Sequence, residues 1–232
     1  MDEITAFLEK LIQFGMLEGL KISDKLEPYF RIDTIGLISK TCCTLANTKV
    51  IDFDRTKMLI AKQYQLSEPK SCDALKIIIE GDASIDFIEF KGLKKFIYNL
   101  WRDGKPIDIQ MESQFDKFKL NYKIEDSLLI LRLMIQNRKF NLTTDERLIY
   151  SKLPKNYIIL TDLELEEDGR LDLFVNLNLL AANNPKNLEK EMSEILQQKI
   201  DIAGSKFPEI NRPILLTCST IDKYYKNREQ TK

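Results

Sequence analysis

The sequence of 232 residues contains no histidine. Catalysis by a Ser-His-Asp triad or by a Cys-His pair is therefore excluded, and so are the zinc sites that use histidine as a ligand. Carboxylates, lysine, tyrosine and bound hard cations remain as catalytic groups, and carboxylate oxygens favour Mg2+, Mn2+ or Ca2+. The missing histidines thus direct attention to acidic residues that lie close together in the fold.

Glycine and proline are also scarce, with eight and seven residues respectively, so no Gly/Pro-rich linker separates two domains. Apolar residues make up 44% of the chain and charged residues 31%, which is typical of a globular protein and not of a disordered one. A chain of this length buries a sizeable core as one unit. We predict a single domain over residues 1–232.

No apolar run reaches the length of a membrane-spanning helix, and the start, "MDEITAFLEKLIQFGMLEGL", is acidic, unlike a cleavable signal peptide. We therefore expect a cytoplasmic protein that does not contact a membrane. The four cysteines, at positions 42, 43, 72 and 218, form no CxxC pair. We expect Cys42 and Cys43 to pack as small apolar residues and not to form a disulfide.

The net charge of −1 does not indicate nucleic-acid binding, but positive charge is concentrated between residues 91 and 123, with eight Lys or Arg against four Asp or Glu. Aromatic residues are interleaved with these charges, and such a segment either follows a phosphate backbone or forms a solvated face above buried aromatics. For Tyr98 and Trp101 we favour core packing over base stacking. The candidates for nucleic-acid binding are Lys94, Lys95, Arg102 and Lys105.

Hydrophobic periodicity and turn signals alternate between helical and strand patterns along the chain. We therefore predict an α/β (α+β) protein with a mixed central sheet flanked by helices. Helices are predicted over 2–18, in "DRTKMLIAKQYQL", over 92–101, from a point past 110, from Thr143 or Thr144 to a stop at Pro154, over 186–201, and in "TIDKYYKNREQTK". Strands are predicted near 49–53, over 73–79 and 85–91, as a hairpin around Asp168-Gly169, and in "RPILLTCS".

The stretch "CDALKIIIEGDASIDFIEFKG" reads as a hairpin with charges at its open end. With a turn centred on Asp82, Asp73 pairs with Lys91, and a slip by one residue pair brings Asp73 opposite Glu89 instead. Both registers put the same residues on one face, because opposed residues of an antiparallel pair point to the same side. That face carries Asp73, Leu75, Ile77, Ile79, Ile85, Phe87, Glu89 and Lys91.

Two carboxylates and a lysine at one strand end are able to meet around one divalent cation, since opposed side chains lie about 5 Å apart. Asp73 and Glu89 would hold Mg2+ or Mn2+, and Lys91 would orient a water or stabilise charge on a phosphate. The simpler alternative is a salt-bridged strand end at the surface. Apolar neighbours on both faces indicate central strands, where an unpaired carboxylate is costly. Asp86, on the opposite face, is interpreted as structural.

The "CD" at 72–73 followed by "EFK" at 89–91 resembles the PD-(D/E)XK nuclease superfamily, and so do the surrounding "DFDRTK", "PKSCDAL", "FIEFKG" and "KIEDSLLIL". The resemblance covers about residues 50–135. It implies a restriction-endonuclease-like core there, with helical and β-hairpin additions after it, metal binding by Asp73 and Glu89, and catalytic assistance by Lys91.

The chain departs from that pattern at Cys72, which stands where the superfamily's name-giving proline would be. The resemblance also implies a further acidic metal ligand from the preceding helix. The candidates are Glu3, Glu9, Glu18 and Asp54, and the sequence does not choose among them.

The leading hypothesis is a magnesium- or manganese-dependent nuclease that hydrolyses phosphodiester bonds, with DNA as its expected substrate. A non-catalytic module that binds protein or nucleic acid on a nuclease-like fold is the alternative, and it would be favoured if a side chain fills the charged end of the hairpin. A third hypothesis is a metal-dependent enzyme for a small phosphorylated substrate. A protein partner or a homo-oligomer stays open in each case.

Overall fold

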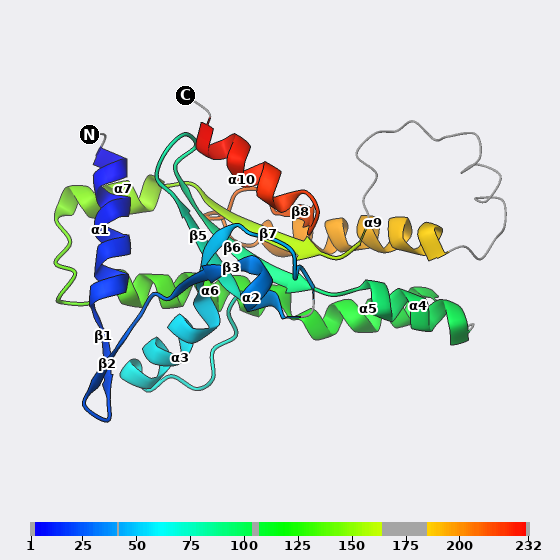
Figure 1. Cartoon of the computed structure of the whole chain (residues 1–232), viewed down its shortest axis with the longest axis horizontal. Helices are drawn as coiled ribbons and strands as arrows, with labels where there is room; N and C mark the ends of the chain where they lie inside the picture. Colours follow the sequence, from blue (N-terminus) through cyan, green and yellow to red (C-terminus); the bar gives the residue numbers. More distant parts are fainter. Residues whose placement is uncertain (1–2, 41, 104–106, 164–184, 231–232) are drawn as a thin grey trace.

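The computed structural model describes residues 3–40, 42–103, 107–163 and 185–230. The chain is an α/β protein built on a six-stranded mixed sheet with the order β3-β4-β5-β6-β7-β8, and helices pack on both faces of this sheet (Figure 1). The first four strands form an antiparallel meander, and β7 and β8 then join in parallel to β6. The predicted fold class is therefore confirmed.

The strands of this sheet are β3 (Ile32–Thr34), β4 (Lys49–Asp52), β5 (Ala74–Ile78), β6 (Ser84–Lys91), β7 (Lys155–Thr161) and β8 (Ile214–Thr217), and a separate hairpin is formed by β1 (Gly19–Ile22) and β2 (Lys25–Pro28). The helices are α1 (Glu3–Leu17), α2 (Ile35–Ser39), α3 (Phe53–Tyr64), α4 (Lys94–Asp103), α5 (Ile107–Phe118), α6 (Leu120–Ile135), α7 (Thr144–Lys152), α9 (Pro185–Gly204) and α10 (Ile221–Gln230).

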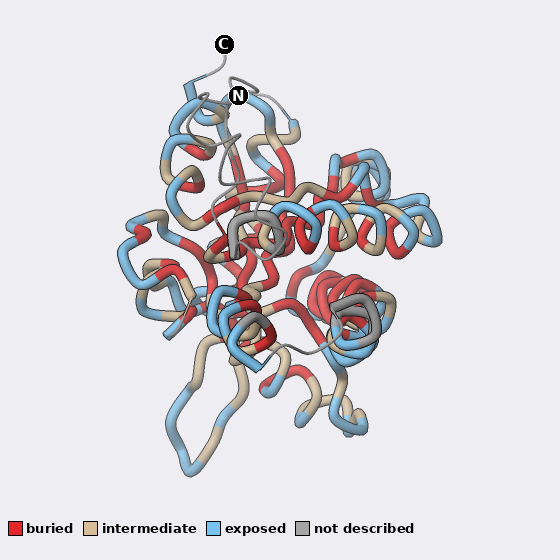
Figure 2. Tube along the Cα trace, turned by 90° about the vertical axis from the view of Figure 1, so that its right-hand side faces the viewer, coloured by how far each residue is buried: buried red, intermediate tan, exposed pale blue. Residues whose placement is uncertain are grey.

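Two apolar cores lie on the two faces of the sheet. Figure 2 shows the buried segments gathered toward the centre of the molecule. The larger core joins the odd-numbered positions of β5 and β6, such as Leu75 and Phe87, to α1, α3, α6 and α9. The smaller core joins the even-numbered positions, such as Ala74 and Ile88, to α2 and α10. The period of two along each strand thus decides which layer every side chain meets.

The turn between β5 and β6 is centred on Gly81 and not on Asp82, because Ile78 pairs with Ser84. Gly81 has a φ of 66°, a left-handed conformation that glycine adopts without a steric penalty. Because the turn centre is one residue earlier than predicted, each residue of β5 faces a residue of β6 two positions earlier than in the Asp82-centred register. Ala74 pairs with Ile88, and the same register, continued by one residue, places Asp73 opposite Glu89. The predicted grouping of side chains is unchanged, because the slip has even parity.

Most predicted elements occur with end points shifted by a few residues. The helix from Thr143 to Pro154 is the clearest case, because Thr143 and Glu146 form a capping box at the start of α7. The long helix predicted to begin past residue 110 is α6, and Lys119, with a φ of 49°, separates it from the preceding α5. The sheet also extends beyond the predicted core of 50–135, since β7 and β8 belong to it. The hairpin predicted around Asp168-Gly169 lies outside the described residues.

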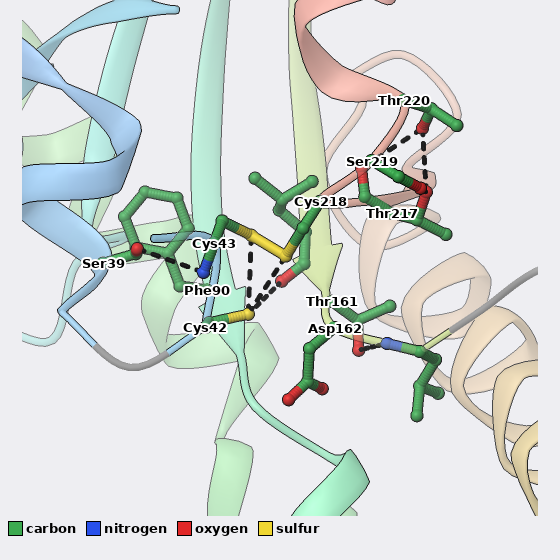
Figure 3. Close-up of a disulfide and its surroundings, with 12 residues drawn as sticks. Ser39, Cys42, Cys43, Phe90, Thr161, Asp162, Thr217, Cys218, Ser219 and Thr220 are labelled. Carbon is green, nitrogen blue, oxygen red and sulfur yellow. Dashed lines mark hydrogen bonds between the residues drawn. A yellow bond between two sulfur atoms is a disulfide. The ribbon is translucent and has the colours of Figure 1, made fainter. Parts of the chain in front are cut away.

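The expectation for the cysteines is wrong at Cys43, which forms a disulfide with Cys218 across 175 residues of sequence (Figure 3). Cys42 is a free thiol that lies beside this bond. The spacing of the cysteines did not reveal this, because the contact depends on how the fold brings the loop after α2 to the residue that follows β8.

Within the described ranges, every helix is either too short or too polar to cross a membrane.

Candidate functional site

Asp73 is held at the start of β5 by the backbone of two neighbouring elements. Its amide donates to the Ile88 carbonyl at 3.0 Å, and its own carbonyl accepts from the amides of Phe53 and Asp54 at 3.1 and 3.3 Å. Its carboxylate Oδ2 accepts from the Phe90 amide at 2.6 Å. The side chain is therefore fixed by β6 and by the first turn of α3, and it is still 23% exposed.

Glu89 and Lys91 leave β6 on the same face as Asp73. Glu89 is completely buried, and its Oε1 accepts a hydrogen bond from Lys91 Nζ. The Lys91 ammonium also lies 4.5 Å from the centre of the Phe118 ring at the end of α5, a cation–π contact that further fixes its position. The three residues that the sequence analysis grouped together are thus neighbours in the structure.

Lys123 on α6 is a fourth charged member of this cluster, and the sequence analysis did not single it out. Its Nζ lies 2.5 Å from Glu89 Oε1 and 3.8 Å from Asp73 Oδ1, so one ammonium contacts both carboxylates. The sequence does contain a signal for this residue: Lys123 lies one helical turn before Ser127, next to the buried stripe of α6. A lysine at such a position requires a charged or polar partner, because burying an unpaired ammonium is costly.

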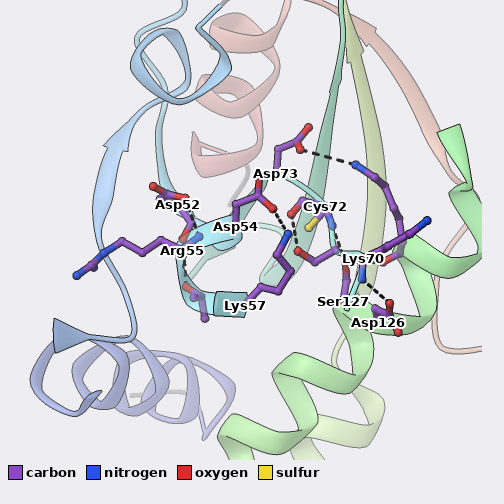
Figure 4. Close-up of polar contacts among 12 residues, drawn as sticks. Asp52, Asp54, Arg55, Lys57, Lys70, Cys72, Asp73, Asp126 and Ser127 are labelled. Carbon is purple, nitrogen blue, oxygen red and sulfur yellow. Dashed lines mark hydrogen bonds and ion pairs between the residues drawn. The ribbon is translucent and has the colours of Figure 1, made fainter. Parts of the chain in front are cut away.

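Cys72 explains how α6 is placed against the start of β5. The Cys72 amide donates to Ser127 Oγ at 2.9 Å, and Ser127 Oγ donates to the Lys123 carbonyl at 2.6 Å. A proline at position 72 has no N–H and would be unable to form this link. Figure 4 shows Cys72 and Ser127 side by side at this junction. The cysteine at position 72, where the resemblance would place a proline, therefore has a structural role through its backbone amide.

Burial dominates the electrostatics of the carboxylates. It raises the pKa of the Glu89 carboxyl, the nearby charge of Asp73 raises this pKa further, and the ammonium groups of Lys91 and Lys123 offset only part of the increase. Burial likewise raises the pKa of Asp73. For Lys123, burial alone would lower the pKa, but the carboxylates of Glu89 and Asp73 outweigh it and raise the pKa. The cluster contains one fully buried acid, Glu89, and one partly exposed acid, Asp73, and additional positive charge would stabilise the ionised form of both.

Two polar atoms in this region are buried without a hydrogen-bond partner among the described residues. They are Glu89 Oε2 and the hydroxyl of Tyr157, whose raised pKa reflects burial first and then the charge of Glu89. A buried carboxylate oxygen without a donor costs about 1–3 kcal/mol or more. Buried unsatisfied groups of this kind are typical of positions that receive a ligand, an ion or water. Glu89 Oε2 therefore fits the role of a metal ligand.

Among the four acidic candidates for a further ligand, the structure brings Asp54 to the cluster. Asp54 lies in the first turn of α3, hydrogen bonded through its amide to Asp73, and its charge contributes to the raised pKa of Asp73. Its carboxylate pairs with Lys57 at 2.5 Å (Figure 4). Glu18 pairs instead with Lys139, while Glu3 and Glu9 lie along α1.

The basic candidates follow β6 directly, on α4. Lys94, Lys95 and Arg102 are exposed, and Lys105 lies outside the described residues. Tyr98, expected to pack in the core, is 54% exposed, so that expectation is wrong for this residue, and nothing is described of the Trp101 side chain. Helical spacing puts Lys94, Lys95, Tyr98 and Arg102 on one face, opposite the buried Ile97 and Leu100.

Asp86, interpreted from the sequence as structural, lies on the opposite face of β6 and is completely buried. Its carboxylate accepts from Arg228 of α10 at 2.6 Å, from Asn156 at 2.7 Å and from Ser84 at 2.9 Å. This saturated set of partners contrasts with the unsatisfied Glu89. Asp86 anchors the C-terminal helix to the sheet.

The raised pKa of Glu89 gives a testable dependence of stability on pH. Between the unfolded value near 4.5 and the higher folded value, the folded state binds more protons than the unfolded state, so stability falls as pH rises through this window. We expect the wild-type protein to lose unfolding free energy relative to Glu89→Gln above about pH 4.5, by about 1.4 kcal/mol for each unit by which the pKa is raised.

Urea unfolding of both proteins from about pH 4 to about pH 8 measures this difference. Parallel stability curves for the wild type and Glu89→Gln would contradict it. Glu80→Gln, an exposed change in the turn of the same hairpin, is the matched control and is expected to follow the wild-type curve.

No family model, curated protein or solved structure matches this sequence.

Proposed function

We propose that the chain is a metal-dependent nuclease of the PD-(D/E)XK type, which hydrolyses phosphodiester bonds of DNA with Mg2+ or Mn2+. The observation that carries this proposal is Glu89 Oε2, a fully buried carboxylate oxygen that has no hydrogen-bond partner among the described residues and lies in one cluster with Asp73 and two lysines. Hard cations prefer such oxygen ligands. Ionised carboxylates with a raised pKa reduce the stability of the fold, and groups of this kind cluster at functional sites. Metal binding would account for their presence here.

Asp73 and Glu89 would hold the cation, and Asp54 is the nearest described candidate for a third carboxylate. When bound, Mg2+ or Mn2+ supplies a Lewis acid and lowers the pKa of a coordinated water. The Lys91 ammonium, fixed between Glu89 and the Phe118 ring, is partly exposed and would donate to a non-bridging phosphate oxygen or orient the attacking water. Lys123 would balance the negative charge of the two carboxylates.

The exposed face of α4 supports a nucleic acid as the substrate. Helix α4 begins three residues after Lys91. Its exposed face presents Lys94, Lys95 and Arg102 together with the Tyr98 ring. Ammonium and guanidinium groups neutralise phosphates, and an exposed aromatic ring stacks on a base. Helix α4 follows β6, the β-strand that carries Glu89 and Lys91. A nucleic acid bound to the exposed face of α4 would therefore pass close to the charged cluster.

The proposal is tested by incubating the full chain with single- and double-stranded DNA and RNA in the presence of Mg2+ or Mn2+. We expect cleavage of DNA that EDTA abolishes and that added Mn2+ restores, because the lysines alone do not generate a nucleophilic water at neutral pH. Gel electrophoresis of end-labelled substrates measures the products. Intact DNA and RNA under all of these conditions would overturn the proposal.

The role of α4 has its own expected outcome. In EDTA, where DNA is bound but not cut, Lys95→Ala should weaken binding and reduce the slope of log affinity against log salt by about 0.9, the contribution of one phosphate contact. Tyr98→Ala should weaken binding to single-stranded DNA by about 1–3 kcal/mol. Fluorescence anisotropy measures both effects. Lys226→Ala, an exposed lysine on α10, is the matched control, and an equal loss in this variant would argue against a specific surface.

One observation favours the non-catalytic alternative: the Lys123 ammonium contacts both carboxylates, as a side chain would if it filled the charged end of the hairpin. On this view the ion pairs replace a cation, and the fold serves as an interaction module. Calorimetric titration with Mn2+ separates the two functions. The nuclease proposal expects binding to the wild type, whereas the alternative expects binding only to Lys123→Met.

A further inference from the structure

We propose that the reduced protein binds Zn2+ through the sulfurs of Cys42, Cys43 and Cys218, with the carboxylate of Asp162 as the fourth ligand. This site lies on the opposite face of the sheet from Glu89 and is independent of the proposed nuclease function. It uses three of the four cysteines, two of which the sequence had predicted to act only as small apolar residues.

The three sulfurs converge from two distant segments of the chain. All three lie within 4.8 Å of one another, and Cys42 Sγ is 3.5 Å from both Cys43 Sγ and Cys218 Sγ. In a tetrahedral site with Zn–S bonds of about 2.3 Å, the sulfurs are separated by about 3.8 Å. Only the disulfide between Cys43 and Cys218 has to open to reach this arrangement, since Cys42 already stands at the required separation.

Asp162 lies next to the cluster at the end of β7 (Figure 3). The Cys218 amide donates to the carbonyl of Thr161 at 2.9 Å, which places β8 and its cysteine beside Asp162. The amides of Leu93 and Lys94 donate to Asp162 Oδ1 at 2.6 and 3.1 Å, so the carboxylate is oriented by outer partners, as metal-ligating carboxylates are. Three thiolates and one carboxylate carry the same total charge as the four thiolates of a structural zinc site.

A thiol relay is the competing use of these cysteines, and the position of Cys42 disfavours it. Cys42 Sγ lies 3.5 Å from both Cys43 Sγ and Cys218 Sγ, so it stands beside their bond and not on the axis of the bond. A thiolate attacks a disulfide along the axis of the sulfur–sulfur bond, and Cys42 is therefore poorly placed for exchange. A zinc ion displaces the thiol proton directly, because metal binding and thiol deprotonation are coupled.

Reduction and zinc binding convert the disulfide form into the zinc form in two steps. The reductant supplies two electrons that break the Cys43–Cys218 bond, and the two sulfurs take up two protons. A dithiol reductant is oxidised to its disulfide, whereas a phosphine takes the oxygen of water and becomes a phosphine oxide. Binding of Zn2+ by three thiols then releases three protons to solvent. A reducing compartment would favour the zinc form, and an oxidising one the disulfide.

The test compares the full chain before and after reduction with tris(2-carboxyethyl)phosphine, using Zn2+ and Co2+ as probes. We expect one Co2+ per reduced chain with thiolate-to-cobalt charge-transfer absorption, displacement of Co2+ by Zn2+, and no such absorption in the oxidised chain. Charge-transfer absorption requires sulfur ligands, so binding at Glu89 and Asp73 does not produce it. Absence of the absorption in the reduced wild type would overturn the proposal, whether or not the nuclease activity is found.

Two variants and a control complete the experiment. Cys42→Ser retains the disulfide, which keeps the oxidised fold intact, and should weaken zinc binding by more than about 100-fold, since even the loss of an outer partner costs 10–100-fold. Asp162→Asn should weaken it by at least about 10-fold. Cys72→Ser, a buried cysteine outside the cluster, should bind as the wild type does. Wild-type affinity in Cys42→Ser would overturn the site, and wild-type affinity in Asp162→Asn would overturn its fourth ligand.

Discussion

Glu89→Gln is expected to lower the rate of DNA cleavage by about 10³-fold or more, the upper range for the loss of a single charged or hydrogen-bonding group that stabilises a transition state. The amide is a weaker ligand than a carboxylate for a hard cation, and it removes the negative charge that Lys91 and Lys123 now share. Side-chain volume is preserved, so the packing around β6 should persist. Single-turnover cleavage in Mn2+ measures the chemical step directly.

The same variant separates a catalytic loss from a structural one. Glu89→Gln should fold at least as stably as the wild type at neutral pH, because it replaces a carboxylate whose pKa burial has raised. Glu80→Gln in the turn of the same hairpin should keep full activity. Cleavage by Glu89→Gln at more than about a tenth of the wild-type rate would exclude Glu89 as a metal ligand, since ligand loss costs at least 10²-fold.

Arg228→Ala is expected to cause the largest loss of stability, about 3–5 kcal/mol, because it leaves the buried carboxylate of Asp86 without its ionic partner. Asn156 and Ser84 would still donate to Asp86, but neither carries a charge. For a chain of this size, such a loss lowers Tm by about 10 °C. Urea unfolding measures the free energy, and thermal unfolding followed by circular dichroism measures Tm.

Two comparisons identify the cause of that loss. Lys226→Ala, an exposed change two residues earlier on α10, should leave Tm nearly unchanged. Adding Asp86→Asn to Arg228→Ala should recover part of the stability, because the second change removes the unpaired charge. A purely additive double mutant would show that the ion pair is not the source of the effect.

Local patterns predicted the parts of the fold that local interactions determine. The capping signal at Thr143 located α7, and the alternation along the β5–β6 hairpin grouped Asp73, Glu89 and Lys91 although the turn is displaced to Gly81. Parity explains this success, since only an odd shift of register exchanges the two faces of a strand.

Contacts between distant segments were not predictable from the sequence alone. Lys123 reaches Glu89 only because Ser127 docks α6 against Cys72, and Cys43 meets Cys218 only because the sheet brings β8 near the loop after α2. The break at Lys119 is likewise invisible to hydrophobic periodicity, because apolar residues continue on both sides of it. The prediction therefore found three of the charges in the cluster and missed the fourth.

The pair of Asp86 and Arg228 also has a consequence for synthesis of the protein. Arg228 lies 142 residues after Asp86 and follows all six strands of the sheet, so the ribosome completes these strands before the guanidinium exists. Until α10 emerges, β6 would carry an uncompensated buried acid, and the nascent chain would remain open to proteases. Polypeptides that terminate before Arg228 would then be degraded, and only chains that include this residue would accumulate.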